Sequence, residues 1–161
     1  MKNDTDTHDV VAGRDDDEAE NIVRLDQDEC WRIVDRHQLG RLGVVERGRP
    51  AVLPVNFARD GSSLIVRVRP GSTIASAADG RRAVLEVDEV DEDLERGRSV
   101  VVHGLLREVI HDDERARLSR LVIRPWAGGS RQVYVRLDAE EITGRSVPLS
   151  AASDGLAADG G

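Results

Sequence analysis

The chain has 161 residues, which is enough for one domain of ordinary size but small for two. Its formal net charge is −8, and most of that charge lies in residues 1–20, where eight acidic residues outnumber Lys2 and Arg14. The rest of the chain is close to neutral, so composition gives no reason to expect nucleic acid as a partner. Cys30 is the only cysteine, which excludes an intramolecular disulfide and a metal site built from several cysteines.

The two ends of the chain differ in composition from its middle. Residues 1–21 are charged and poor in apolar residues, which predicts a disordered acidic tail. Residues 148–161 are small and glycine-rich, which predicts a flexible C-terminal tail and leaves residues 22–147 as the folded domain. No apolar run approaches the roughly 20 residues of a membrane span, and no signal-peptide core is present, so we expect a cytoplasmic protein without a membrane partner.

The first ordered element is expected to be a helix. Asp26 can cap its N-terminus, and Gly40 is expected to end it. Cys30 is interpreted as a small buried core residue of this helix. Strands are then expected at 41–46, 50–58 and 63–69. The Asp-Gly pair at 60–61 is the strongest hairpin signal in the chain, and residues 72–78 are compatible with a short helix.

Strands also dominate the second half of the chain. We expect one at 83–90, after a turn at 79–80, and a long one at 99–110, in which Gly104 allows a bend or bulge. Asp112 can cap a second helix over 113–122, and strands at 132–137 and 142–147 complete the domain. Because short turns join most strands, the pattern predicts a mainly β fold with a few helices, antiparallel pairing and closure into a barrel.

Most motifs that carry chemistry are absent. The sequence has no phosphate-binding loop, dinucleotide fingerprint or nucleophile elbow. The four histidines lack metal-ligand spacing, and the acidic run at 86–95 lacks the glycine of a calcium loop, so no metal site is expected. His103 lies in an apolar strand and is interpreted as a sheet histidine rather than a ligand contact.

One segment, residues 67–73, has the composition of a phosphate site. The guanidinium groups of Arg67 and Arg69, the hydroxyl groups of Ser72 and Thr73, and backbone N–H groups after Gly71 could together hold a phosphate. An ordinary polar turn between a strand and a helix would have the same composition, so these residues alone leave both interpretations open.

Several short phrases stand in a definite order along the folded domain. They are LDQDECW (25–31), HQLGRLG (37–43), PVNF (54–57), LIVRV (64–68), PGST (70–73), LEVD (85–88), SVVVHG (99–104), RPWAG (124–128) and EITGR (141–145). In this order and spacing the chain resembles the pyridoxamine 5'-phosphate oxidase-like, FMN-binding split-barrel family, and most of all its short, actinobacterial-type members. The joint order is stronger evidence for the fold than for an activity.

The resemblance implies a six-stranded antiparallel split β-barrel that works as a homodimer with two flavin sites at the dimer interface. FMN is the cofactor that it implies. The flavin ring would lie along strand 54–57, the phosphate would be held on segment 67–73, and residues around Ser99 would approach the ring or the partner subunit's flavin. The cofactor-binding residues marked by the family pattern are Pro54, Val55, Asn56, Phe57, Arg67, Val68, Ser72, Thr73 and Ser99.

The sequence departs from the family pattern at three positions. Thr73 stands where members often carry a phosphate-binding lysine, Val68 where they often carry threonine, and Arg98 where they often carry tryptophan. Loss of one charge-assisted contact would cost about 1.5–3 kcal/mol, or roughly ten- to a hundredfold in affinity. Arg69 and Arg98 either compensate for the missing lysine or are ordinary solvent-facing arginines.

The expected function is therefore that of a flavin-binding protein or flavin-dependent oxidoreductase with a small-molecule substrate of unknown identity. A flavin carries its own redox chemistry, so no dedicated acid or base is required and no catalytic residue is nominated. One alternative is a deazaflavin-dependent reductase, whose longer and more acidic cofactor could meet Arg67, Arg69 or Arg98. Another is a non-catalytic flavin-binding or sensing protein. Oxidation of pyridoxamine phosphate itself is not expected, because the family's substrate-phosphate residues are not found near the C-terminus.

Overall fold

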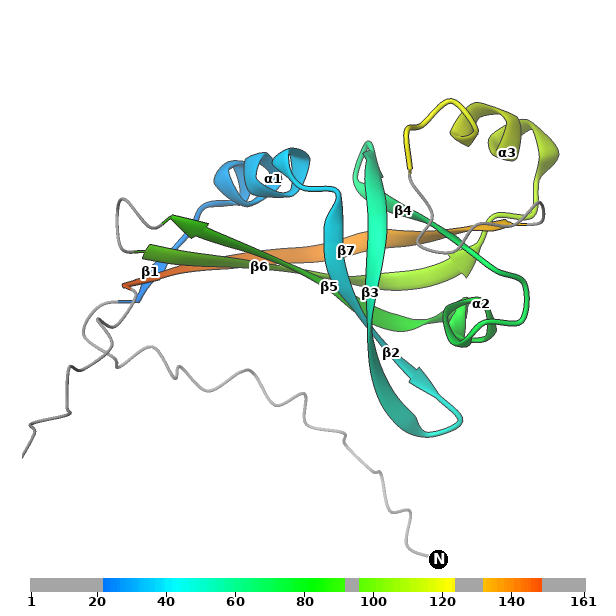
Figure 1. Cartoon of the computed structure of the whole chain (residues 1–161), viewed down its shortest axis with the longest axis horizontal. Helices are drawn as coiled ribbons and strands as arrows, with labels where there is room; N and C mark the ends of the chain where they lie inside the picture. Colours follow the sequence, from blue (N-terminus) through cyan, green and yellow to red (C-terminus); the bar gives the residue numbers. More distant parts are fainter. Residues whose placement is uncertain (1–21, 92–95, 124–131, 149–161) are drawn as a thin grey trace, which may run out of the picture.

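The computed structural model describes residues 22–91, 96–123 and 132–148. The tail predicted at 1–21 lies outside the described residues, as does the tail predicted at 148–161 except for Pro148, which ends the last strand. Strands dominate the described chain, and three short helices accompany them (Figure 1). In chain order the elements are β1 (Val23–Arg24), α1 (Gln27–Arg36), β2 (Leu39–Glu46), β3 (Arg49–Asp60), β4 (Ser63–Val68), α2 (Thr73–Ala77), β5 (Asp79–Asp91), β6 (Arg96–Glu108), α3 (Asp112–Leu118) and β7 (Val133–Pro148).

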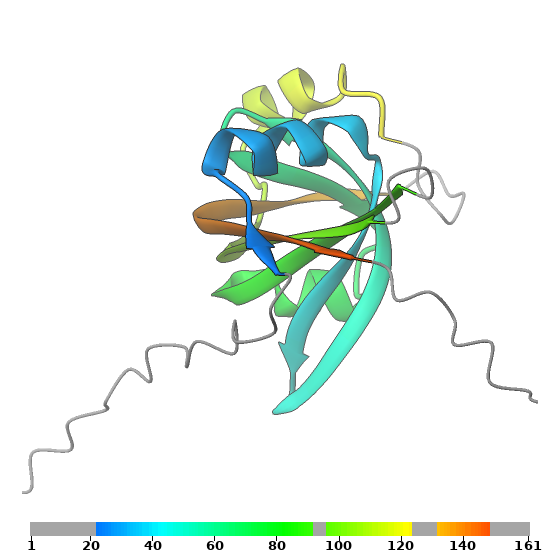
Figure 2. The ribbon, with the colours of Figure 1, turned by 90° about the vertical axis from the view of Figure 1, so that its left-hand side faces the viewer.

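Six strands close into a ring in the order β7, β4, β3, β2, β5, β6 and back to β7. Every pairing in the ring is antiparallel, and the short strand β1 adds beside the C-terminal half of β7. Figure 2 shows the strands wrapping around a common centre. The prediction of a mainly β, six-stranded antiparallel barrel is therefore confirmed.

The barrel interior holds the main core, and α1 and α2 bury their apolar sides against it from opposite sides of the barrel (Figures 1 and 2). Cys30 of α1 is fully buried, as its position in the predicted helix indicated. Each large apolar side chain removed from water contributes roughly 1.5–3 kcal/mol. The largest fully buried side chains in this interior are Phe57, Ile33, Leu42, Leu64, Leu85, Leu106 and Leu137.

The N-terminus of α1 forms as predicted, but its C-terminus does not. The Asp26 carboxylate accepts a hydrogen bond from the backbone N–H of Glu29 at 2.7 Å, which is the expected cap. The helix ends at Arg36 rather than at Gly40. Gly40 lies in β2, where a Cβ atom would come within 2.8 Å of the Glu86 carbonyl oxygen. Glycine at this position therefore allows β2 and β5 to lie close together, and it does not end the helix.

Strands β5 and β7 are longer than the sequence predicts, and β6 spans 96–108 rather than the predicted 99–110. The two strands predicted at 132–137 and 142–147 are one continuous strand, because β6 pairs with β7 along its whole length. The predicted bulge occurs in this pairing, between His103 and Gly104. The turn predicted at 79–80 is a register shift inside β5, where Gly80 has a φ of 91°.

Helix α3 builds a second, smaller core on the outer face of β4 and β7. Leu118 of α3 and Ile123 just beyond it are buried with Ile65 and Val109. The helix spans 112–118 rather than 113–122, and its N-cap is His111, without a side-chain cap hydrogen bond. The Asp112 cap prediction is therefore wrong, because Asp112 is already the first helical residue. This outer layer lies directly beside the predicted phosphate segment.

Candidate functional site

The predicted ring-binding strand, residues 54–57, divides its side chains between the two faces of β3. Val55 and Phe57 are buried in the barrel core, whereas Pro54 is exposed and Asn56 half-buried. Phe57 pairs with Val66 of β4, and both point inward. Because side chains alternate along a strand, Asn56 and the β4 residue Arg67 point to the outer face. A ligand on this face can contact Val55 and Phe57 only through their backbone.

Arg67 is the most distinctive polar residue of this outer face. Its Nη1 donates to the backbone oxygen of Ile123 at 3.5 Å, and its guanidinium carbon lies 5.4 Å from the centre of the Tyr134 ring. Its Nε atom is buried and has no hydrogen-bond acceptor among the described residues. Leaving a buried donor unsatisfied costs about 1–3 kcal/mol, more for a charged group, and an oxyanion bound at Nε would remove that cost.

The turn after β4 places Ser72 and Thr73 close to Arg67 along the chain. The Ser72 backbone N–H donates to the Arg69 carbonyl oxygen at 3.2 Å, and Gly71 takes a φ of 71° that favours glycine. The Ser72 hydroxyl accepts from the Ala75 backbone N–H at 3.3 Å and caps α2. Its hydroxyl hydrogen can still be donated to a ligand. Thr73, the first residue of α2, is half-buried.

The two remaining predicted residues are placed differently. Val68 is partly buried against the barrel core, so its side chain supports the end of β4. Ser99 pairs with Arg145 near the C-terminal end of β7, whereas Arg67 pairs with Tyr134 near its N-terminal end. That separation along β7 corresponds to roughly 35 Å. A single chain therefore does not bring Ser99 to the Arg67 site.

Ser99 belongs instead to a charged cluster on β2, β5 and β6. Its hydroxyl donates to Glu86 Oε1 at 3.3 Å, and Arg41 bridges Glu86 at 3.2 Å and Asp88 at 2.5 Å. Burial raises the pKa of Glu86, and the neighbouring Asp88 raises it further. Arg98 next to Ser99 faces acidic side chains near α1, so within one chain it does not replace the missing lysine at position 73.

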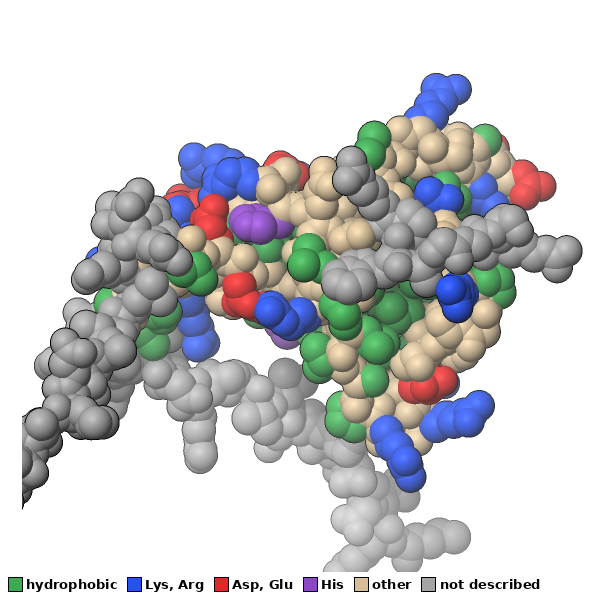
Figure 3. All heavy atoms as spheres, viewed as in Figure 1, with side chains coloured by type: hydrophobic (Ala, Val, Ile, Leu, Met, Phe, Trp, Pro, Cys, Tyr) green, Lys and Arg blue, Asp and Glu red, His purple; other side chains and the backbone are tan. Residues whose placement is uncertain are grey.

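An apolar hollow of about 340 Å³ lies between the Ser99 cluster and the tip of hairpin β2–β3. Two of its valines, Val45 and Val52, are 47 % and 68 % exposed. Figure 3 shows apolar side chains gathered over β2 and β3. His103 lines the hollow, as a residue of a sheet face. The sequence did not lead us to predict this apolar surface. The run of small and β-branched residues in β2 and β3 is the feature that could have indicated it.

Other classes of site find no support among the described residues. Within 22–91, 96–123 and 132–148, no group of three or more His, Cys, Asp or Glu side chains lies close enough to hold a metal ion. In the same ranges, no helix has the length and apolar character that a membrane crossing requires. The RPWAG phrase at 124–128 lies outside the described residues.

A closed ring of six antiparallel strands with helices on its flanks is the architecture of a split-barrel protein. The relationship can be stated more narrowly from the sequence. Residues 26–146 match the family described as pyridoxamine 5'-phosphate oxidase, and the chain belongs to this family.

Individual relatives agree with this assignment. Uncharacterized protein Rv0080 of Mycobacterium tuberculosis is 33% identical over 131 residues, which cover 78% of this chain and 86% of that protein. A candidate pyridoxamine 5'-phosphate oxidase from Corynebacterium glutamicum has a similar structure, with a TM-score of 0.71, 30% identity, and coverage of 80% of this chain and 99% of that one. An FAD binding protein from Mycobacterium smegmatis gives a TM-score of 0.67, 28% identity, and coverage of 78% and 97%.

Proposed function

We propose that this protein binds a flavin by its ribityl phosphate and uses it as an oxidoreductase on a small molecule. The observation that carries the proposal is the buried Arg67 Nε, which has no acceptor among the described residues and lies on the outer face beside Asn56 and the Ser72 turn. A phosphate oxygen satisfies such a donor with a charge-assisted hydrogen bond. Family membership, with a solved relative named as an FAD binding protein, supports a flavin as the phosphate's carrier.

FMN is the first candidate cofactor, and FAD is the second because of the name of the Mycobacterium smegmatis relative. Both carry the phosphate that Arg67 would hold. A bound flavin supplies hydride transfer at its ring. The chain would neutralise the phosphate with Arg67, receive it at the hydroxyl groups of Ser72 and Thr73, and support the ring along the outer side of β3 at Pro54 and Asn56. A deazaflavin is the alternative cofactor if neither FMN nor FAD binds.

The same proposal includes a homodimer in which the partner completes each site. Ser99 lies too far from Arg67 to join it within one chain, so a second copy is needed to place a Ser99 region near the flavin. The exposed apolar surface around Val45 and Val52 is suited to such a contact, because large apolar side chains in one patch favour burial against a partner.

The test of cofactor binding is a titration of the full chain, stripped of bound cofactor, with FMN, FAD and a deazaflavin, followed by flavin fluorescence. Saturation by FMN or FAD at micromolar or tighter affinity, with one cofactor per chain, is the expected result. The absence of binding by both flavins at tens of micromolar would refute the flavin proposal. A bound flavin that a strong chemical reductant bleaches but that no nicotinamide cofactor reduces would favour the non-catalytic, flavin-storing alternative.

The dimer is tested by light scattering coupled to size exclusion. The wild-type chain is expected to have twice the mass of one chain, and Val52→Asp to shift the population toward monomer, because a carboxylate at this exposed position would be buried without a partner. A wild-type protein that is monomeric at micromolar concentration, with flavin present, would contradict this part of the proposal.

A further inference from the structure

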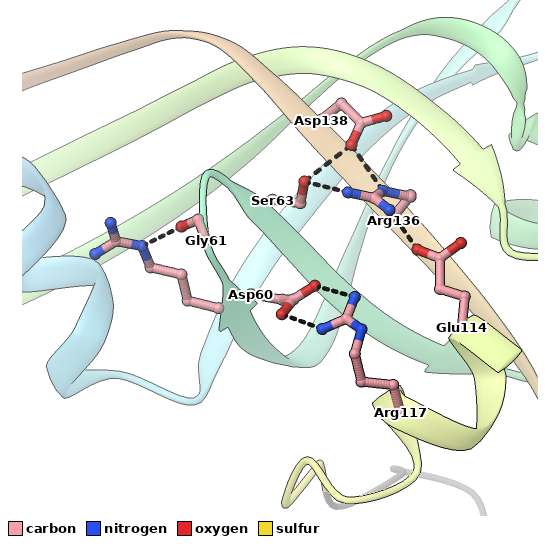
Figure 4. A network of polar contacts seen from close by, with 8 residues as sticks. Asp60, Gly61, Ser63, Glu114, Arg117, Arg136 and Asp138 are labelled. Carbon is pink, nitrogen blue, oxygen red and sulfur yellow. Dashed lines mark hydrogen bonds and ion pairs between the residues drawn. The ribbon is translucent and has the colours of Figure 1, made fainter.

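Two ion pairs, which we call the α3 clamp, join helix α3 to β3 and β7 (Asp60–Arg117 and Glu114–Arg136; Figure 4), and a longer pair, Arg115–Glu108, joins it to the end of β6. The Arg117 guanidinium makes a two-pronged contact with the Asp60 carboxylate, at 2.6 and 2.8 Å. Arg136 of β7 binds Glu114 of α3 and also donates to Ser63 and Asp138. Each pair joins α3 to a strand of the barrel, so together they fix where the helix lies on the outer face.

A short buried path leads from the clamp to Arg67. After α3 ends, the Leu121 backbone N–H donates to the Leu118 carbonyl oxygen and the Ile123 N–H to the Leu121 carbonyl oxygen, each at 3.0 Å. Leu118 is fully buried and Ile123 nearly so. The Ile123 carbonyl oxygen is the group that accepts the hydrogen bond from Arg67 Nη1. A displacement of α3 would therefore move this acceptor.

The contact with Ile123 determines the orientation of the Arg67 guanidinium. A guanidinium has five N–H donors in a rigid, planar fork. Nη1 contacts the Ile123 oxygen at 3.5 Å and the Tyr134 ring lies beside the group, whereas the buried Nε has no acceptor among the described residues. An arginine held in its binding orientation loses less conformational freedom when the ligand arrives, so it binds more tightly than a mobile one.

We propose that the α3 clamp is a positioning device for Arg67, and that it sets the affinity of the site for a phosphate group. This inference rests on the proposed flavin function and adds positioning residues to it. Asp60, Glu114, Arg117 and Arg136 do not touch the phosphate. They act through Ile123, whose carbonyl oxygen orients the arginine.

The experiment compares two ligands that differ only in the phosphate: FMN, which has it, and riboflavin, which lacks it. The double variant Glu114→Gln, Arg117→Gln removes both ion pairs from the α3 side and leaves Arg67, Ile123 and Tyr134 in place. We expect its Kd for FMN to rise about tenfold, the size of one weakened charge-assisted contact. Its Kd for riboflavin should stay within about twofold of wild type, because only the phosphate contact is affected.

Glu140→Gln is the matched control. The Glu140 carboxylate accepts a hydrogen bond from Arg82 Nη1 at 2.9 Å, so this variant also removes an exposed ion pair, between β7 and β5 and away from α3. This variant should bind both ligands as wild type does. Arg117→Lys keeps the charge but not the fork, and should weaken FMN binding in the same direction by a smaller factor, which preserves the test if the double variant does not fold.

The outcomes separate the inference from the proposed function. If wild type prefers FMN to riboflavin and the clamp variants keep that preference, or lose affinity for both ligands equally, the positioning role is wrong and the flavin site stands. If wild type binds neither ligand, or binds them equally, the phosphate site itself is wrong and the inference falls with it.

Discussion

A single methyl group at position 104 should weaken the barrel considerably. A Cβ atom on Gly104 would clash with the Asp138 carbonyl oxygen, at a distance well below the 3.0 Å that real Cβ contacts essentially never cross, and would lie 3.1 Å from the Ala139 Cα atom. The obstructing atoms belong to the backbone of β7, at the bulge where β6 and β7 change register. Unlike a side chain, this backbone cannot rotate away, so Gly104→Ala must push the two strands apart.

The size of the effect follows from two opposing contributions. Without the clash, replacing a strand glycine by alanine would stabilise the fold by about 0.5–1 kcal/mol, because glycine loses more freedom on folding. Overpacking a filled site costs about 1–3 kcal/mol, and each ladder hydrogen bond lost adds about 1 kcal/mol. We expect Gly104→Ala to lower the free energy of unfolding by roughly 2–4 kcal/mol.

Urea unfolding followed by circular dichroism measures this change, with the slope m compared between variants. Gly43→Ala is the control, since its Cβ would meet the Val84 carbonyl oxygen at an ordinary 3.8 Å and closely approach only a side-chain methyl group of Val84, at 2.8 Å, which lines a hollow into which it can shift. That variant should change the free energy of unfolding by about 1 kcal/mol or less. A Gly104→Ala protein as stable as wild type, or more so, would refute the contact argument for the bulge.

Three further predictions follow from burial and charge. Burial raises the pKa of the Cys30 thiol and hides its sulfur, so a thiol reagent at pH 8 should modify Cys30 only after denaturation, and rapid modification of the native chain would contradict this. The hydrogen bond from Arg117 lowers the pKa of Asp60. The Asp60–Arg117 ion pair therefore stabilises the folded protein above about pH 4, and this stabilisation is lost as the pH falls through the lowered pKa that Asp60 has in the native state. The stability difference between wild type and Asp60→Asn should shrink from pH 7 to pH 3, and an unchanged difference would exclude the ion pair as its source. Thr73→Lys should tighten FMN binding about tenfold if residue 73 faces the phosphate, and an unaltered Kd would remove it from the site.

Local signals predict much of this fold because they act over a few residues. The Asp26 cap needs only the N–H group three residues later, and the Gly61 turn needs only a positive φ between two strands. Where the structure of a residue depends on a partner strand that is distant in the sequence, the local sequence pattern predicts the wrong structure. Gly40 has the appearance of a helix stop, but β5 requires it. The polar stretch around Glu140 resembles a turn, but β6 keeps it within one strand.

The candidate site likewise has residues that the sequence indicates and residues that it does not. Sequence phrases mark Arg67 and the turn that follows it, since these residues are neighbours in the chain. They give no information about Ile123, which is 56 positions from Arg67 and contributes a backbone oxygen that any residue type would supply. Nor do they show that Val55 and Phe57 face the core, or that Ser99 of β6 pairs with the C-terminal end of β7, far from Arg67.

The most direct test of the account is the Kd for FMN of wild type and Arg67→Gln, measured by flavin fluorescence with riboflavin as the reference ligand. Glutamine keeps a polar side chain but removes the charge and the buried Nε donor. The account predicts that FMN affinity falls roughly ten- to a hundredfold while riboflavin affinity changes little. An FMN affinity that Arg67→Gln leaves unchanged in a folded protein would contradict the claim that Arg67 holds a flavin phosphate.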